Sequence, residues 1–163
     1  MNRKPASIIL PEKLDVKLKG KAEEIGTLLE ELGVELMLKG LNEKLNPEEL
    51  VEHYQLLSEK YLAKAGDFLN KGNLAQASEK LWGATSLTIK RVAAKRGLRL
   101  EKHGSLWDFI NKLSQETGDK DIIRFFHTAN SLHRNFYENQ MNREVIAVAK
   151  EDIEQLIDRL GKI

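Results

Sequence analysis

The distribution of proline constrains this chain more than any other feature of its sequence. Proline occurs only at positions 5, 11 and 47, so the stretch from Glu48 to the C-terminus lacks the residue that most strongly breaks helices. Apolar residues recur along that stretch every three or four positions, which is the period of an amphipathic helix. The sequence therefore predicts an all-α fold, with a bundle of about five helices over residues 46–163.

The first two helices of the predicted bundle form a long antiparallel hairpin. Asn46-Pro47-Glu48 is a helix start, because it combines a capping side chain, a proline in the first turn and an acid that the helix dipole favours. The first helix ends at Lys71-Gly72, and Asn73 caps the second, which continues to Gly97. The tight turn between them predicts that they lie side by side.

Three more helices are expected, one from Ser105, one over about 119–139 and one over about 143–160. The second helix of the hairpin has two apolar stripes. One of them, formed by Trp82, Ile89 and Ala93, faces either the rest of the bundle or another subunit. The sequence leaves both possibilities open.

Residues 1–42 are predicted to form an N-terminal extension that begins with a short strand. Ser7-Ile8-Ile9-Leu10 is a β-like run, and two short helices follow it, ending at Gly26 and near Gly40. This order resembles the ribbon-helix-helix arrangement, the DNA-binding dimer of many antitoxins. The resemblance would direct Ser7 and Ile9 into the major groove, where isoleucine reads bases poorly. The alternative is a helical extension that packs on the bundle.

Composition excludes several classes of function. The net charge of +1 gives no general attraction to nucleic acids or membranes, so a nucleic-acid partner would need a local basic patch. The absence of cysteine excludes disulfides, thiolate zinc sites and cysteine nucleophiles. No apolar run approaches the roughly 20 residues that span a bilayer, and residues 1–10 lack the pattern of a secretory signal. We therefore expect a cytoplasmic protein without a membrane partner.

The predicted helix over 119–139 carries the candidate site. Five apolar residues share one face and are expected to point into the core: Ile122, Phe125, Ala129, Leu132 and Phe136. The opposite face is polar and consists of Arg124, His127, Ser131, Arg134 and Glu138. His133 lies at the edge of the apolar stripe, beside Phe126.

This polar face has two interpretations. It is either a solvated helix surface with one or two ion pairs, or a cleft or dimer interface in which arginine meets RNA phosphate. In the second case His127 or His133 would act as an acid or base near neutral pH, whereas a histidine at a core margin can also make a single structural hydrogen bond. The histidines show no ligand spacing typical of a metal site, so we expect neither a metal nor a cofactor.

Basic residues are concentrated where the hairpin ends. The cluster consists of Lys90, Arg91, Lys95, Arg96, Arg99 and Lys102, and Glu101 opposes it. Such a cluster can neutralise phosphates, but cations at a helix C-terminus are also favoured by the dipole alone. We find no glycine-rich phosphate loop, nucleophile elbow or pair of catalytic carboxylates.

Two segments together resemble the archaeal PaREP family, within the HEPN-like superfamily. They are QASEKLWGA, residues 76–84, and LHRNFYE, residues 132–138. The Asn46 helix start, the Asn73 turn and the segment 103–107 also fall where the pattern of that family would place them. The resemblance covers most of the chain, and it implies an up-and-down helical bundle that is often dimeric.

The resemblance also implies a function. The wider superfamily includes metal-independent RNases, often toxins paired with an antitoxin, whose motif is an arginine and a polar residue followed along the helix by a histidine. Arg134-Asn135 matches the start of that motif, but Asn139, Gln140 and Met141 occupy the positions of the histidine. Asparagine cannot transfer a proton at neutral pH, so the sequence favours a non-catalytic or weakly active protein that binds RNA or a nucleotide.

The sequence therefore predicts three alternative functions, in a toxin–antitoxin or defence context. The first is binding of RNA or a nucleotide by Arg134 and Asn135, with support from Arg124, His127, Lys90, Arg91 and Lys95. The second is a metal-independent ribonuclease that uses His127 or His133 as acid or base. The third is an interaction module that docks a toxin or antitoxin protein. A homodimer is expected in each case.

Overall fold

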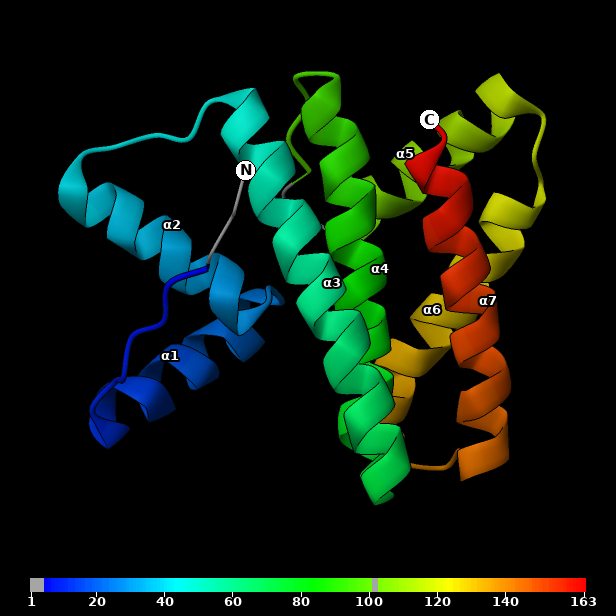
Figure 1. The fold of residues 1–163 in the computed structure, drawn as a ribbon, viewed down its shortest axis with the longest axis horizontal. Coiled ribbons are helices and arrows are strands. Elements are labelled where there is room, and N and C mark those ends of the chain that lie inside the picture. Colours follow the sequence, from blue (N-terminus) through cyan, green and yellow to red (C-terminus); the bar gives the residue numbers. More distant parts are fainter. Residues whose placement is uncertain (1–4, 101–102) are drawn as a thin grey trace. The chain divides into compact units, whose positions relative to one another are not determined.

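The computed structural model describes residues 5–100 and 103–163, and these residues form seven α-helices (Figure 1). The helices are α1 (Glu12–Ile25), α2 (Leu29–Leu41), α3 (Pro47–Lys71), α4 (Leu74–Lys95), α5 (His103–Thr117), α6 (Asp121–Glu138) and α7 (Arg143–Gly161). The prediction of an all-α bundle is confirmed. None of the helices in the described ranges is long and apolar enough to cross a membrane.

The chain divides into two compact units at the junction between Asn46 and Pro47. The first unit holds α1 and α2, which pack against each other. Its buried apolar residues are Ala22, Leu28 and Leu32. The second unit holds α3 to α7 and contains a large apolar core.

The predicted strand over residues 7–10 is wrong for the single chain. Residues 5–10 adopt neither helix nor strand, and the side chain of Ile9 is 99% exposed. A strand exists only when its backbone groups pair with those of a neighbour, and nothing in the described part of this chain pairs with the segment. The β-forming composition of Ser7 to Leu10 is therefore not sufficient to make a strand here.

The predicted hairpin is confirmed in α3 and α4. Pro47 is the first residue of α3, where its missing N–H costs no helical hydrogen bond. Gly72 follows the helix with a φ of +78°, a conformation that glycine adopts without a steric penalty. The side chain of Asn73 then accepts a hydrogen bond of 3.3 Å from the backbone N–H of Gln76 and starts α4. Figure 1 shows the two helices running side by side in opposite directions.

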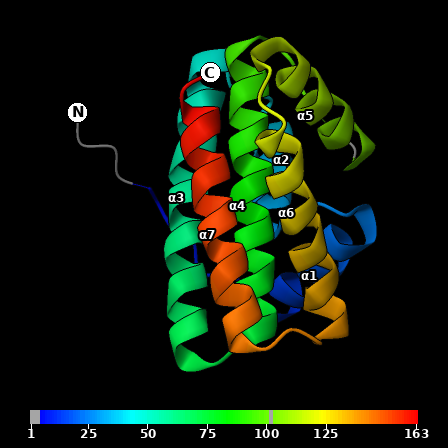
Figure 2. The same ribbon diagram turned by 90° about the vertical axis from the view of Figure 1, so that its right-hand side faces the viewer.

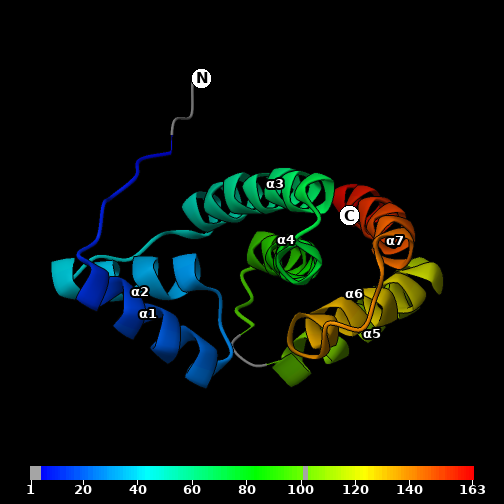
Figure 3. The same cartoon turned by 90° about the horizontal axis from the view of Figure 1, so that it is seen from below.

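Helix α4 is the centre of the second unit. Viewed along the helices, it is surrounded by α3, α6 and α7 (Figure 3). Nine consecutive residues, 81–89, are buried, so this segment of the helix has no solvent-facing side. From the side, α3, α7 and α6 lie around α4, with α5 against its upper end (Figure 2). A helix that is covered in this way must bury its polar residues as well as its apolar ones.

Three of the four buried hydroxyl groups of α4 bond to the backbone of their own helix. Ser78, Thr85 and Thr88 donate hydrogen bonds of 2.8–3.0 Å to the carbonyl oxygens of the residues four positions earlier. This pattern satisfies each hydroxyl donor without a partner on another helix. Small and hydroxyl residues can therefore occupy the interior of α4 and allow its neighbours to approach closely.

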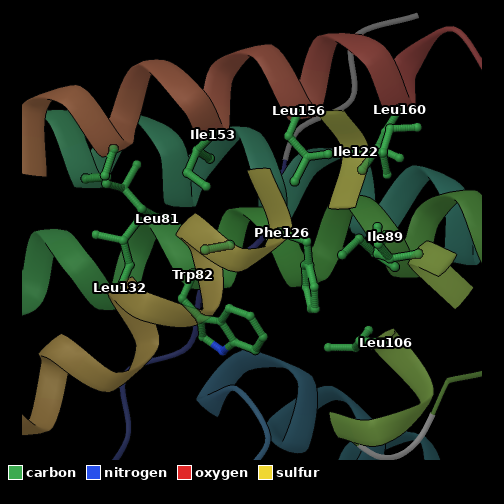
Figure 4. Packing of buried hydrophobic residues seen from close by; sticks show 14 of the residues in the cluster. Leu81, Trp82, Ile89, Leu106, Ile122, Phe126, Leu132, Ile153, Leu156 and Leu160 are labelled. Carbon is green, nitrogen blue, oxygen red and sulfur yellow. The ribbon is translucent and has the colours of Figure 1, made fainter. Parts of the chain in front are cut away.

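The apolar core lies between α4, α6 and α7 (Figure 4). Leu81 and Ile89 of α4 meet residues of α6 and α7 that are almost completely buried. These residues are Ile122, Phe126, Leu132, Ile153, Leu156 and Leu160. The second apolar stripe of α4, formed by Trp82, Ile89 and Ala93, belongs to this core. The stripe therefore faces the bundle of its own chain rather than a second subunit.

The first residues of α5 and α6 each differ from the prediction by two positions. Helix α5 begins at His103 rather than Ser105, and α6 begins at Asp121 rather than Asp119. Asp119 accepts a hydrogen bond of 3.0 Å from the N–H of Asp121 and one of 2.6 Å from Arg159 of α7. The hydrogen bond to Asp119 is the main cause that raises the pKa of the Arg159 guanidinium, and it ties the segment before α6 to α7.

The buried face of α6 is also rotated relative to the prediction. Phe125 and Phe136 were expected in the core but are half-buried, while Phe126 and Asn135 are buried. The periodicity alone could not separate Phe125 from Phe126, because adjacent residues on a helix differ by only about 100°. The burial of Asn135 was not expected, since a polar side chain in an apolar stripe requires partners that the sequence does not specify.

Candidate site on helices α4 and α6

The predicted polar face of α6 lies on the surface. Its five members are all exposed: Arg124, His127, Ser131, Arg134 and Glu138. Arg124 forms an ion pair with Asp121 one turn earlier, which compensates its charge. Arg134 makes neither an ion pair nor a hydrogen bond with the described part of the chain. Of the two predicted phosphate-binding arginines on α6, Arg134 is therefore the one whose guanidinium is available.

His133 is held between α6 and α4 by three neighbours. Its ring stacks on the indole of Trp82, with ring centroids 4.8 Å apart and an angle of 28° between the planes. Its Nδ1 atom lies 3.3 Å from Oε2 of Glu79. The ring of Tyr137 meets it edge-on at 5.9 Å. A ring that is stacked on one side and bonded to a carboxylate has a fixed orientation.

Glu79 and Trp82 reach His133 because they lie three residues apart on α4, which places them on one side of that helix. Both are in the buried or half-buried part of the bundle, and the side chain of Glu79 is 20% exposed. Neither residue was among the predicted site residues. Both nevertheless lie in the segment 76–84, one of the two segments that carried the family resemblance, and this was the signal that could have identified them.

Tyr137 extends the group around His133 to the surface. Its side chain is 58% exposed and also meets the ring of Phe136 at 4.9 Å. Tyr137 lies three residues after Arg134 and four after His133, so both are its neighbours on the surface of α6. A free guanidinium, an exposed aromatic ring and an oriented imidazole therefore lie together near the C-terminal end of α6. We call Glu79, Trp82, His133, Arg134 and Tyr137 the α4–α6 site.

His127 does not belong to the same group. Its ring lies 4.9 Å from that of Trp107 on α5, and it is six residues from His133. Six residues of α-helix rise about 9 Å. The two histidines predicted as alternatives for acid or base are thus in different surroundings, and of the two it is His133 that has a carboxylate neighbour among the described residues.

Asn135 is a structural residue whose polar atoms are occupied. Its side chain is 2% exposed, and its Nδ2 donates a hydrogen bond of 2.9 Å to Oγ of Ser78 on α4. Its Oδ1 accepts hydrogen bonds of 2.8 and 2.9 Å from the N–H groups of Gln140 and Met141. One amide thus joins α6 to α4 and also shapes the turn after α6. Because its side chain is buried and bonded in this way, Asn135 is not available to contact a ligand at the surface.

The predicted basic cluster is divided among different surroundings. Arg96 pairs with Glu116 at 2.8 Å and lies over the ring of Phe109, so it fastens α4 to α5. Lys95 is exposed, whereas Lys90 and Arg91 are half-buried. Lys102 lies outside the described residues. The cluster is therefore not one continuous phosphate-binding surface.

The described residues contain no group of three or more histidine, aspartate or glutamate side chains arranged to hold a metal ion. The α4–α6 site has one imidazole and one carboxylate, which is fewer than the protein ligands of a typical zinc site. The groups that the site offers are the imidazole of His133, the carboxylate of Glu79, the guanidinium of Arg134 and the aromatic rings.

Fold and site define a helical-bundle protein whose polar site is built from two facing helices. The chain belongs to the archaeal PaREP1/PaREP8 family, whose sequence pattern matches residues 53–157, a range that includes the whole α4–α6 site. The predicted resemblance to the PaREP family is thereby confirmed. A crystal structure of a protein from Sulfolobus solfataricus is similar, with 27% identity and a TM-score of 0.58 over 65% of this chain and 94% of that one. No curated protein matches the chain.

Replacing Asn135 should destabilise the second unit. Asn135→Ala removes the bond to Ser78 and leaves buried polar groups without partners, so we expect a loss of about 2 kcal/mol in the free energy of unfolding. Urea unfolding followed by circular dichroism measures this loss. The control is Ser131→Ala, an exposed position on the same helix, where the change should stay below about 0.5 kcal/mol. Equal stability of the two variants would contradict the structural role of Asn135.

Proposed function

We propose that this protein binds RNA or a nucleotide at the α4–α6 site. The observation that carries the proposal is the exposed Arg134, which has no partner in the described chain, beside Tyr137 and the oriented ring of His133. A guanidinium forms two parallel hydrogen bonds with a phosphate group. An exposed aromatic ring offers a surface on which a base can stack.

The arrangement favours a nucleic-acid ligand over a free inorganic anion. Inorganic phosphate needs only the charge of Arg134, whereas the rings of Tyr137 and His133 add a contact that suits a base. Because Trp82 and Glu79 already hold His133, little freedom remains to be lost when a ligand binds. A single cationic contact also agrees with the net charge of +1, which supports local rather than general attraction to phosphate.

Removing the guanidinium of Arg134 should weaken RNA binding more than removing that of Arg124, which is paired with Asp121 on the same helix. We expect Arg134→Ala to raise the Kd for single-stranded RNA by about ten-fold, because one charge-assisted contact is lost. Arg124→Ala should change it less, since Asp121 already neutralises that side chain. Gel-shift or fluorescence-anisotropy titrations of both variants give the two values.

The salt dependence of the same titrations tests the nature of the partner. Binding to phosphate weakens as salt is added, whereas docking of a toxin or antitoxin protein on apolar surface does not. Binding that is insensitive to salt, or equally affected in both variants, would contradict the proposal. Such a result would favour the interaction module that the sequence also allowed.

A second candidate function is metal-independent cleavage of RNA by the same site. The specific observation is the 3.3 Å contact between Glu79 and Nδ1 of His133, because a carboxylate on one ring nitrogen fixes the tautomer and orients the other nitrogen. An imidazole oriented in this way can take the proton of an RNA 2′-hydroxyl. The hydroxyl oxygen then attacks the adjacent phosphorus to form a 2′,3′-cyclic phosphate, and the 5′-oxygen leaves with a proton taken from water. Arg134 would stabilise the charge on the phosphate.

Cleavage assays with EDTA separate this candidate from binding alone. If the site is catalytic, His133→Ala should lower the cleavage rate by 10²–10⁴-fold, the usual contribution of a general base. Glu79→Gln should lower it less, because it affects only the orientation and charge of the ring. His127→Ala, at the other histidine of α6, should retain the rate. Wild-type protein that binds RNA without cutting it would exclude the candidate.

We further propose that the protein assembles as a homodimer through its first unit. Residues 1–46 carry eight basic and eight acidic side chains, so two copies would not repel each other by net charge. The described part of this unit has many exposed large apolar residues: Ile8, Ile9, Leu14, Val16, Ile25, Leu36, Met37 and Leu41. A unit of this size has difficulty in forming a sufficient core alone, and assembly is a common remedy.

A charge placed on this apolar surface should reduce assembly without unfolding the chain. Leu36 is 48% exposed, so we expect Leu36→Glu to leave the helical circular dichroism signal intact and to shift the mass toward the monomer. Light scattering after size-exclusion chromatography measures the mass. Val145→Glu, at a position on α7 that is 47% exposed, is the matched control and should not change it. A wild-type monomer at high concentration would refute the dimer.

A further inference from the structure

A pocket lies between α3, α4 and α7, away from the residues of the α4–α6 site. Helices α3 and α7 both pack closely on α4 but touch each other only sparsely, which leaves a hollow between them. The hollow measures about 300 Å³. This volume lies at the lower end of the range for small-molecule sites and suits a ligand the size of an amino acid or a sugar phosphate.

Arg91 is the residue in this pocket whose charge has no partner. Its side chain is half-buried, and its Nε atom is buried without a hydrogen-bond partner in the described chain. No carboxylate of the described residues lies within ion-pair distance of its guanidinium. A buried donor without a partner costs free energy, and a bound water molecule or ion is one explanation for such a group in a native protein.

The other polar groups of the pocket already have partners. Lys162 pairs with Asp158 at 3.4 Å, and the side-chain amide of Gln55 donates to Glu59. The hydroxyl groups of Ser58 and Thr88 donate to backbone carbonyls of their own helices. Their oxygen atoms, like the carboxylate of Glu59, can still accept hydrogen bonds. The pocket thus offers one unpaired cation together with several acceptors.

The guanidinium of Arg91, on α4, lies beside the C-terminal end of α7, but this location provides no hydrogen-bond partner for its Nε atom. A Cβ atom on Gly161 would lie 3.9 Å from Nη2 of Arg91, so the guanidinium is beside the last turn of α7. A cation there gains from the helix dipole. However, the carbonyls of Arg159 and Leu160 already accept bonds from the N–H groups of Lys162 and Ile163. The dipole therefore favours a charge at this place without providing a partner for Nε.

We propose that this pocket binds a small ligand with one oxyanion group, which Arg91 holds, and with hydrogen-bond donors for Glu59, Ser58 and Thr88. Carboxylate and phosphate share the geometry that a guanidinium recognises. Leu62 and Ile157 provide the apolar part of the wall. The site is too small for an oligonucleotide and shares no residue with the α4–α6 site, so it is a second binding site rather than a part of the first.

Nuclear magnetic resonance of the full chain tests this proposal directly. The Arg91 Nε–H signal is assigned by its disappearance in Arg91→Lys, and the wild-type protein is titrated separately with sodium phosphate and sodium acetate. We expect a saturable shift of this signal and of the Gly161 amide. Saturation by phosphate alone points to a phosphate ester, and saturation by acetate points to a carboxylate. If sodium chloride at the same ionic strength produced the same shifts, the proposal would be overturned.

Two variants separate the pocket from its surroundings. Arg91→Gln should weaken binding of the effective anion by about ten-fold or more, as judged by the Gly161 amide. Lys95→Gln, one turn later on α4 and exposed, should bind as the wild type does. Equal weakening in both variants would indicate general electrostatic attraction and contradict the site. The wild-type titration decides the matter even if Arg91→Gln fails to fold, and RNA binding by Arg134 is unaffected by either outcome.

Discussion

The burial of α4 on all sides is the constraint on which the rest of the second unit depends. Residues 81–89 are all buried. The surface of α4 that α3, α6 and α7 contact must therefore be apolar or have its hydrogen-bonding groups satisfied within α4 itself. Threonine and serine fulfil that requirement by bonding to the carbonyls of their own helix. A larger side chain at Ala84 or a charge at Ile89 would separate the neighbouring helices, because both positions are completely buried.

The same helix also fixes the site. Because α4 is held from several directions, Glu79 and Trp82 present a rigid wall to α6, and His133 rests on that wall with a defined orientation. The bond between Asn135 and Ser78 fastens α6 to α4 two residues further along. Arg134 lies between these two anchored residues in the sequence but points to the surface. Its backbone is therefore positioned by neighbours that are themselves buried or bonded, which is the arrangement that a binding residue requires.

The two faces of α4 have different consequences for ligands. On the side that faces α6, Glu79 and Trp82 of α4 form the α4–α6 site, in which the imidazole of His133 and the aromatic rings lie beside the exposed guanidinium of Arg134. Toward α3 and α7 the packing is incomplete, and the half-buried Arg91 lines a hollow with several hydrogen-bond acceptors. One basic cluster in the sequence thus separates into residues with unrelated surroundings, since Arg96 fastens α5 instead. Charge that is contiguous along a helix need not be contiguous on the surface, because successive residues point in different directions.

The sequence by itself determined which segments of the second unit are helices. Three signals suffice for this: the absence of proline after Pro47, the cap at Asn73 and the apolar periodicity. Each of them acts within one or two turns of helix and needs no distant partner. The exposed positions of Arg124, His127 and Arg134 follow from the same periodicity. The tertiary structure alone decided that Phe126 and not Phe125 is buried, that Asn135 is a structural bond and that Glu79 adjoins His133. It also decided that residues 7–10 lack a strand. These outcomes depend on partners far away in the chain, and no local pattern specifies which distant group will meet a given side chain.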